Sequence, residues 1–234
     1  MRTIAVIARK GGSGKTTVAA HLAIAAHLAG RRTAVADTDP QESAIEVFKR
    51  RQAPGPEAFV STPAGLLEAQ IRVQRAGADA FIIDTPAGTE EGMSNAIVLA
   101  DLSLLVIRPT FLDLAAAVYT ADVLRRLRKP ALVVLNQAPV TRDGAEPPQV
   151  KRALQALRLM RLPVAPAILR TRASYQTTIE SGRSAVETAP SGPAARELGE
   201  LWAFIERFAF APRERMTRQA PAAFPEPVSA AAVE

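Results

Sequence analysis

A glycine-rich segment near the N-terminus constrains this chain more than any other feature. Residues 4–8 form the apolar run IAVIA, residues 9–17 form RKGGSGKTT, and a helical pattern then continues to residue 29. A strand, a glycine-rich loop, a Lys-Thr pair and a helix in this order predict a phosphate-binding P-loop. Glycines let backbone N–H groups turn inward around phosphate oxygens, and the helix N-terminus adds partial positive charge. We therefore expect the chain to bind a nucleotide.

The residues of this loop have individual expected roles. Lys15 is expected to reach the β- and γ-phosphates, and the Thr16 hydroxyl is expected to hold Mg²⁺. The residues expected to contact the nucleotide are Gly11, Gly12, Ser13, Gly14, Lys15, Thr16 and Thr17. A general P-loop has glycine six positions before its lysine, whereas this chain has Arg9 there and a second lysine, Lys10, beside it. Lys10 is either a surface residue of the loop or a second phosphate contact.

The remaining sequence predicts an α/β fold, a P-loop NTPase with a mostly parallel twisted sheet and helices on both faces. Short apolar runs alternate with helical patterns, as in sheets that are covered on both sides. The expected strands are 3–8, 33–37, 80–83, 102–107 and 131–135, with 164–169 as a last strand or extended segment. The expected helices are 16–29, 42–51, 64–76, 90–99, 112–127, 148–159 and 192–210, and residues 52–57 are expected to form a loop.

Length and composition set the domain organisation and exclude some functions. The 234 residues, 48% of them hydrophobic, suffice for one core. We expect an ATPase domain at 1–210 and a disordered Pro/Ala-rich tail at 211–234. The absence of cysteine excludes disulfides and Cys-ligated zinc or iron–sulfur clusters. No apolar run is long enough to span a membrane, and the first strand begins without a signal peptide, so we expect a cytoplasmic protein.

Positive charge is concentrated in one part of the chain. The net charge of +6 divides into 0 for residues 1–120, +8 for residues 121–183 and −2 for residues 184–234. A concentrated basic region is typical of proteins with a polyanionic partner. An arginine-rich composition on solvated helices gives the same pattern, so charge alone does not choose between the two.

Three aspartates follow predicted strands and are candidates for the chemistry of phosphoryl transfer. Asp84 follows the apolar run AFII and is expected to hold Mg²⁺ as a Walker B carboxylate. Asp37 and Asp39 are two residues apart, so in an extended segment they point the same way. Asp37 is expected nearer the metal, and Asp39 is expected to orient the attacking water. The alternative for each aspartate is that it caps a neighbouring helix.

Four segments together carry a resemblance to a known family. They are KGGSGKTT at 10–17, VADTDPQ at 35–41, FIIDTPAG at 81–88 and VIRPTFLDLAAA at 106–117. Over residues 1–208 the chain resembles the ParA/MinD family of deviant Walker A ATPases, most closely the short ParF-like partition proteins.

The resemblance implies roles for particular residues. Lys10 matches the signature lysine, which reaches across a dimer interface to the phosphates of the other subunit. Lys15 matches the P-loop lysine, Asp39 the hydrolytic aspartate and Asp84 the Walker B aspartate. The catalytic residues implied are thus Lys10, Lys15 and Asp39, with Thr16, Asp37 and Asp84 at the metal. Asn136 matches a position that reads adenine through its amide.

The resemblance also implies a cellular function. Family members bind ATP and Mg²⁺, form a nucleotide sandwich dimer, bind DNA without sequence preference and release it when a ParB-like or adaptor protein stimulates hydrolysis. The cycle positions a plasmid, a chromosome or another cargo, which implies a cytoplasmic protein that is nucleoid-associated in its ATP state. The DNA-binding candidates are Arg170, Arg172, Arg183 and Arg196, with Lys151 and Arg152 as equal alternatives. The sequence lacks the N-terminal helix-turn-helix extension of some members, so operator binding is not expected.

Two other functions fit the same scaffold less well. A MinD-like ATPase that cycles on membranes needs a basic amphipathic helix near its C-terminus. The expected helix 192–210 instead carries Glu197, Glu200 and Glu206, which favours core packing of its apolar side. A metabolic ligase or synthetase would need substrate residues outside the nucleotide site, and the sequence offers no second catalytic group.

Overall fold

The computed structural model describes residues 1–88 and 90–210. Its centre is a six-stranded sheet in the order β3-β2-β4-β1-β5-β6, and every pairing between these strands is parallel. The strands are β1 (Arg2–Ile7), β2 (Thr33–Asp37), β3 (Glu57–Val60), β4 (Ala80–Asp84), β5 (Leu102–Ile107) and β6 (Ala131–Leu135). The predicted α/β architecture with a parallel sheet is confirmed.

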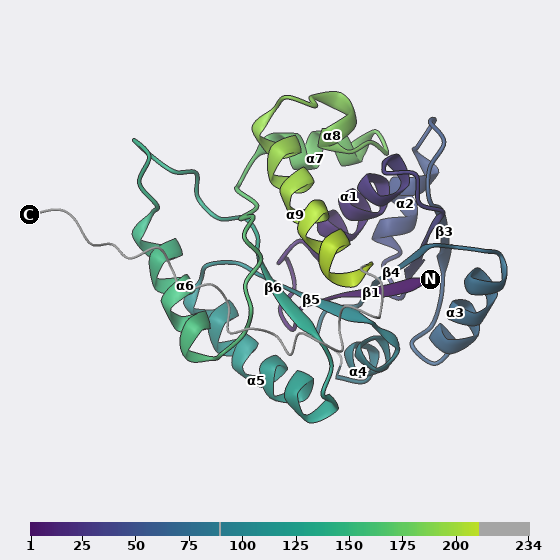
Figure 1. Ribbon diagram of the computed structural model, residues 1–234, viewed down its shortest axis with the longest axis horizontal. Helices are drawn as coiled ribbons and strands as arrows, with labels where there is room; N and C mark the ends of the chain where they lie inside the picture. Colours follow the sequence, from purple (N-terminus) through teal and green to yellow (C-terminus); the bar gives the residue numbers. More distant parts are fainter. Residues whose placement is uncertain (89, 211–234) are drawn as a thin grey trace, which may run out of the picture.

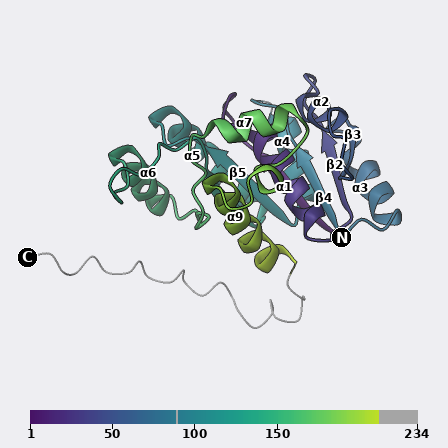
Figure 2. The same ribbon diagram turned by 90° about the horizontal axis from the view of Figure 1, so that it is seen from above.

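Helices cover both faces of the sheet (Figures 1 and 2). They are α1 (Lys15–Leu28), α2 (Ser43–Lys49), α3 (Leu66–Arg75), α4 (Glu90–Leu99), α5 (Phe111–Leu127), α6 (Pro148–Leu159), α7 (Ala173–Glu180), α8 (Ala185–Thr188) and α9 (Pro193–Ala209). Side chains of α1, α7, α8 and α9 join one hydrophobic core, and those of α3 to α6 join the other. Figure 1 shows these two groups of helices on opposite sides of the strands.

The central strands are mostly apolar because each of their faces is buried. Ile4 and Val6 of β1 belong to the core under α1, whereas Ala5 and Ile7 belong to the core on the other face. Successive side chains of a strand point to opposite faces, so two buried faces require an unbroken apolar run. This is why β1, β2, β4, β5 and β6 lie within a residue or two of their predicted positions.

The predictions were wrong where burial is partial. The strand β3 lies at the sheet edge and its four residues are half-buried or exposed, so no apolar run marked it. Residues 164–169, predicted as a last strand or an extended segment, form an extended segment with isolated bridges at Val164 and Arg170, which confirms the second of these alternatives. Helices α7 and α8 were missed because they are short and partly polar. A capping box formed by Ser184 and Glu187 starts α8, and its S-x-x-E spacing was a readable signal.

Two further predictions concern the C-terminal region. The apolar side of α9 packs in the core as predicted, since Leu198, Leu201, Trp202 and Ile205 are buried there, while Phe208 near the helix end is exposed. The predicted disordered tail at 211–234 lies outside the described residues, so the division into domain and tail stays a prediction. Within the described part of the chain, no helix is both long and apolar enough to cross a bilayer.

A buried arginine joins the segment after α2 to the α7–α8 region. The Arg51 side chain is only 4% exposed, and it donates to the Gly182 carbonyl at 2.9 Å and to Glu187 at 2.8 Å. The Gly182 backbone has φ +68°, and a Cβ on it would lie 2.6 Å from the Arg51 Cα. The close backbone approach and the left-handed conformation both require glycine at this position.

We predict that Gly182→Ala destabilises the protein by about 3 kcal/mol, because both strain and overlap oppose the new methyl group. The midpoint of thermal unfolding should fall by about 6–12 °C in a chain of this size. Gly199→Ala is the matched control, because Gly199 lies within α9 with no atom within 4 Å of the added Cβ. That change should stabilise by about 0.5–1 kcal/mol. Equal midpoints for the two variants would contradict the prediction.

Candidate functional site

The expected site residues converge at the carboxyl ends of the central strands, where open α/β sheets bind ligands. The loop after β1 leads directly into α1, whose first residue is Lys15. In the adjacent strands, Asp37 at the end of β2 is paired with Asp84 at the end of β4. Lys15 interacts electrostatically with both Asp84 and Asp39. The structure therefore brings the loop lysine and all three predicted aspartates together.

The loop after β1 has the backbone of a phosphate cradle. Gly12 and Gly14 have φ values of +71° and +87°, which side chains other than glycine rarely adopt. Gly11 and Gly12 are exposed, and no atom lies closer than 3.7 Å to a Cβ placed on either. A Cβ on Gly14 would overlap the amide nitrogen of Asn136. The loop therefore has open space beside Gly11 and Gly12, and it packs against Asn136 at Gly14.

The two lysines of the loop have opposite environments. Lys15 is buried, and burial lowers the pKa of its ammonium while the charges of Asp84 and Asp39 oppose that shift. A cation in such a dry environment interacts strongly with phosphate oxygens. Lys10 is exposed and has no hydrogen bond or ion pair with any described residue. Its ammonium group is therefore available to a group outside this chain.

Asp84 is a fully buried carboxylate. Its exposed fraction is 0%, and burial raises its pKa to about 7 although the neighbouring Thr16 hydroxyl opposes the shift. Neither of its oxygens has a hydrogen-bond partner among the described residues, and the same holds for the Ser13 hydroxyl. Buried polar atoms are normally satisfied, so the oxygens of Asp84 and Ser13 fit a site that binds a cation or a hydrogen-bond donor.

Mg²⁺ with a nucleotide fits this donor set. Mg²⁺ prefers oxygen ligands and commonly takes only one or two protein ligands, with waters and substrate phosphates as the rest. Thr16 and Asp84 supply such oxygens side by side. In the ranges 1–88 and 90–210 no three His, Cys, Asp or Glu side chains group as a complete metal site. Waters and nucleotide phosphates would supply the remaining ligands of a metal here.

The two neighbouring aspartates have different partners. Asp37 accepts from the Asp39 N–H at 3.0 Å, from the Ala44 N–H at 2.8 Å and from the Ile45 N–H at 3.2 Å. Its carboxylate therefore holds the N-terminal turn of α2, which is the capping alternative, and both oxygens are already bonded. Burial raises the pKa of Asp37, and these three N–H groups oppose the shift. Since both oxygens of Asp37 are bonded to backbone N–H groups, the geometry favours the capping alternative over a metal ligand, and its place at the metal stays a prediction.

Asp39 is less constrained than Asp37. Its side chain is half-buried, and one carboxylate oxygen accepts from the Gln41 N–H at 3.0 Å. The other oxygen has no bond in the described structure. Its charge acts on Lys15 and Asp84, so the carboxylate faces the nucleotide side of the site.

Two residues that follow β6 donate hydrogen bonds to the backbone of the glycine-rich loop. The Asn136 amide donates to the Ser13 carbonyl at 2.8 Å, and the Gln137 amide donates to the Gly12 carbonyl at 3.0 Å. Asn136 is only 6% exposed. The adenine contact expected for Asn136 stays a prediction, because here its amide nitrogen is bonded to the loop. Gln137 was missed by the sequence analysis, although its place directly after Asn136 at a strand end was a usable signal.

Two arginines near the loop were also missed. Arg108, at the end of β5, forms a two-point ion pair with the buried Asp113, with distances of 2.6 and 3.2 Å. Its remaining terminal nitrogen lies 3.7 Å from the Cβ position of Gly12. The guanidinium of Arg9 lies over the Tyr119 ring at 3.8 Å from its centre. Arg9 adds positive charge beside the loop, whereas the charge of Arg108 is paired with Asp113. The replacement of glycine by Arg9 in the motif was the signal for Arg9.

The expected DNA-binding arginines divide into two kinds. Arg170 is 11% exposed and pairs with Glu146, while Arg172 pairs with Glu197 at 2.6 Å. Each charge is paired within the fold, which weakens the case for phosphate contacts by these two arginines, and their DNA-binding role stays a prediction. Arg183 and Arg196 are exposed, and each has a hydrogen bond only to a backbone carbonyl within the described residues.

Comparisons with known proteins agree with this geometry. Residues 4–188 match the family model described as the CobQ/CobB/MinD/ParA nucleotide binding domain. The chain is 31% identical over 201 residues to the "Maintenance of carboxysome distribution protein A" of Gloeobacter kilaueensis, covering 84% of this chain and 88% of that protein. It is 26% identical over 213 residues to the protein of the same name from Halothiobacillus neapolitanus, covering 85% and 94%.

Solved structures share the fold. The cell division ATPase MinD of Pyrococcus furiosus has a TM-score of 0.72 at 23% identity, covering 89% of this chain and 99% of that one. The ATP complex of a Cyanothece McdA variant has a TM-score of 0.70 at 17% identity, covering 88% and 95%.

Proposed function

Because this chain belongs to the CobQ/CobB/MinD/ParA nucleotide-binding domain family and is an ATPase of the ParA/MinD type, we propose that it positions a cargo by an ATP-switched cycle. In this cycle the ATP-bound chain forms a homodimer and binds DNA without sequence preference, and an adaptor or ParB-like partner stimulates hydrolysis and release. The observation that carries the proposal is Lys10, which is exposed beside the nucleotide site and has no hydrogen bond or ion pair with the residues that the structure describes. An exposed cation at this place suits the phosphates of a second subunit.

The site residues suggest a division of labour during hydrolysis. The loop 11–17 would bind the phosphates, with Lys15 as the buried cation. Thr16 and Asp84 would hold Mg²⁺, which neutralises the charge that develops on the phosphoryl oxygens. Asp39 would orient the attacking water through its unbonded carboxylate oxygen. Asp37 would act indirectly, by holding the segment that carries Asp39.

We propose a protein assembly as the cargo in preference to a plasmid. Two relatives that together span most of this chain are named for carboxysome distribution. The sequence motifs alone favoured partition proteins in general, so these relatives narrow the choice of cargo. The membrane-cycling alternative loses support because the apolar side of α9 is buried in the core.

Lys10→Ala should spare ATP binding but remove partner-stimulated hydrolysis, because its ammonium would act only on the nucleotide of the other subunit. A cation that enters from a second protein can contribute about 10³-fold in turnover. ATP turnover of Lys10→Ala should be measured with the partner protein present. Its ATP affinity should be measured by titrating the variant alone with ATP. Lys49→Ala is the control, because Lys49 is an exposed lysine paired with Glu46 on α2, away from the loop. Normal stimulated turnover in Lys10→Ala would refute the role across the interface.

The proposed cycle is tested by binding to a random-sequence DNA duplex with ATP, with ADP and without nucleotide, at two salt concentrations. Binding only with ATP, weakened by salt, is the expected result, since phosphate contacts release counterions. Basal hydrolysis should lie well below the roughly 1–100 per second of kinases. Absence of DNA binding in every state would overturn the proposal. Vesicle binding by the full chain would then favour membrane cycling, and ATP hydrolysis that depends on a small substrate would favour a metabolic enzyme.

A further inference from the structure

The C-terminal ends of α5 and α6 carry a group of arginines that we call the basic edge. Its members are Arg125, Arg126, Arg128, Arg158 and Arg161, and all five are exposed. Between residues 125 and 161 the sequence has nine basic residues and only two acidic ones, Asp143 and Glu146. Glu146 is already paired with Arg170. The basic edge therefore has little negative charge from its own segment.

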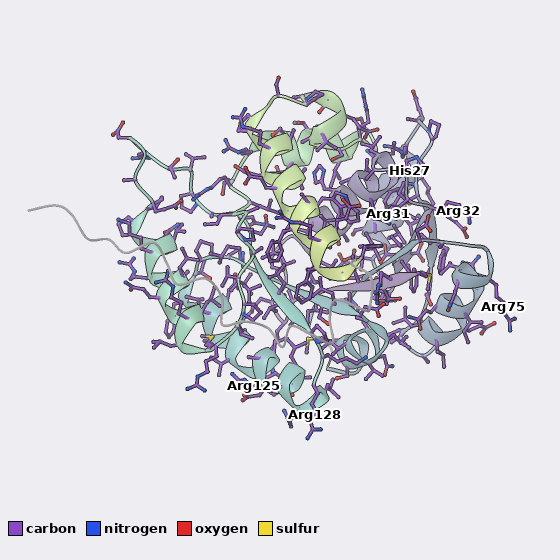
Figure 3. The ribbon with its side chains drawn as sticks, in the orientation of Figure 1. His27, Arg31, Arg32, Arg75, Arg125 and Arg128 are labelled. Carbon is purple, nitrogen blue, oxygen red and sulfur yellow. The ribbon has the colours of Figure 1, made fainter. Side chains whose placement is uncertain are left out.

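The two helix ends form one surface although they are far apart in sequence. Arg125 near the end of α5 donates to the Met160 carbonyl just after α6 at 3.1 Å. Arg161 donates its backbone N–H to the Arg158 carbonyl at 3.0 Å in the turn that ends α6. Figure 3 shows Arg125 and Arg128 extending from the end of α5 at the outer rim of the molecule. The five arginines thus lie around one junction.

The charge of the basic edge is not neutralised within the fold. Of the ion pairs formed by the described residues, only that of Arg125 with Asp122 involves a member of the edge. Arg126 bonds only to a carbonyl of its own helix, at 3.4 Å. Other arginines, such as Arg51 and Arg172, face carboxylates at 2.8 and 2.6 Å. Four arginines of the edge are consequently left with uncompensated charge.

We propose that the basic edge binds the phosphate backbone of duplex DNA. This deepens the proposed function and rests on it. Guanidinium groups bind phosphate oxygens at two points, and clustered arginines favour a polyanion of regularly spaced phosphates. On α6 the exposed Lys151 and Arg152 extend the positive surface by about 15 Å along the helix. Phosphate contacts of this kind need no base readout and give no sequence preference.

A membrane surface fits the basic edge less well. Leu127 and Leu159 are the large apolar side chains exposed at these helix ends in the described structure. An interfacial helix inserts a continuous apolar face into the lipid, and two leucines on separate helices do not form one. The rest of the apolar side of α6, including Val150, Ala153 and Leu157, is buried in the core.

The position of the basic edge separates its role from that of the nucleotide site. Helix α5 begins at Phe111, close to the loop and Arg108, and its 17 residues extend for about 25 Å. The edge lies at the far end of this helix. A change there can therefore alter DNA affinity without touching the P-loop.

The test combines Arg126→Gln, Arg158→Gln and Arg161→Gln in the full chain with ATP present. Affinity for a random-sequence duplex, measured by fluorescence anisotropy, should fall at least about tenfold, and the salt slope should shrink by about 3 because three phosphate contacts are lost. The matched control combines Arg32→Gln, Arg50→Gln and Arg75→Gln. These three arginines are exposed and lie at the other side of the fold, where Figure 3 labels Arg32 and Arg75. The control removes the same charge and should keep the parent affinity.

Several outcomes would overturn the inference. Parent-like DNA affinity of the edge variant would exclude the basic edge as the DNA contact. An equal loss of DNA affinity in the control variant would show that the effect comes from net charge rather than from this surface. Loss of binding in the Arg183→Gln, Arg196→Gln double variant, with the edge variant normal, would place the interface there. A parent chain that binds no DNA in any nucleotide state would instead refute the proposed function itself. Thermal unfolding midpoints equal to that of the parent would show that each variant is folded.

Discussion

Replacing Lys15 with alanine is expected to abolish nucleotide binding. Its ammonium is the buried cation of a site that also contains Asp84 and Asp39. Without it, phosphates would enter a region dominated by carboxylates. Loss of a hydrogen-bonded charge of this kind costs about 3 kcal/mol or more, which is a decrease in affinity of about 150-fold or more.

The measurement is a fluorescence titration of the variant with ATP and with ADP in the presence of Mg²⁺. Lys10→Ala is the natural comparison, because it removes the exposed lysine of the same loop and should keep its affinity. Removing Lys15 relieves its own burial cost but leaves the buried Asp84 without a nearby cation. The thermal unfolding midpoint of the nucleotide-free variant should therefore be measured beside the titration, to show that the variant is folded. ATP affinity within a few-fold of the parent would exclude the proposed role of Lys15.

The strands of this fold could be read from the sequence where burial is complete. Residues of β1, β4 and β5 are buried on both faces, so their composition alone specifies a central parallel strand. At the sheet edge this rule fails, since β3 faces solvent and needs only a few apolar residues. Short helices such as α8 are stabilised by a cap and by Arg51 rather than by periodic apolar residues. Such tertiary contacts leave little trace in a local pattern.

The sequence could show which residues belong to the site, but not which of their side chains bond to one another. The glycine-rich loop and Asp84 have roles that follow from local sequence, because a strand end and a helix start fix their positions. The bonds of Asn136 and Arg170 link segments 123 and 24 residues apart in the sequence. Composition showed that residues 121–183 are basic. Only the ion pairs with glutamates distinguish Arg170 and Arg172 from the exposed arginines of the basic edge.

Asp39→Ala is expected to trap the protein in its ATP-bound state. The lost carboxylate is the one with an oxygen free to orient water, since both oxygens of Asp37 are bonded to backbone N–H groups. A positioned group that assists proton transfer contributes about 10²–10⁴-fold, and hydrolysis should fall by this amount. ATP affinity should stay the same or rise, because one negative charge near the phosphates is removed. If the proposed cycle holds, DNA binding should then persist long after ATP is added.

Asp37→Asn separates the two aspartates in the same assay. Asparagine keeps one acceptor oxygen, and we expect mainly a stability loss of about 1 kcal/mol from a weakened cap on α2. Single-turnover hydrolysis and the lifetime of the DNA complex should be measured for both variants. If Asp39→Ala hydrolyses ATP at the parent rate while Asp37→Asn does not, the assignment is reversed. In that case Asp37 would have to accept from the attacking water in addition to its three backbone N–H groups, or release one of these N–H groups when nucleotide binds.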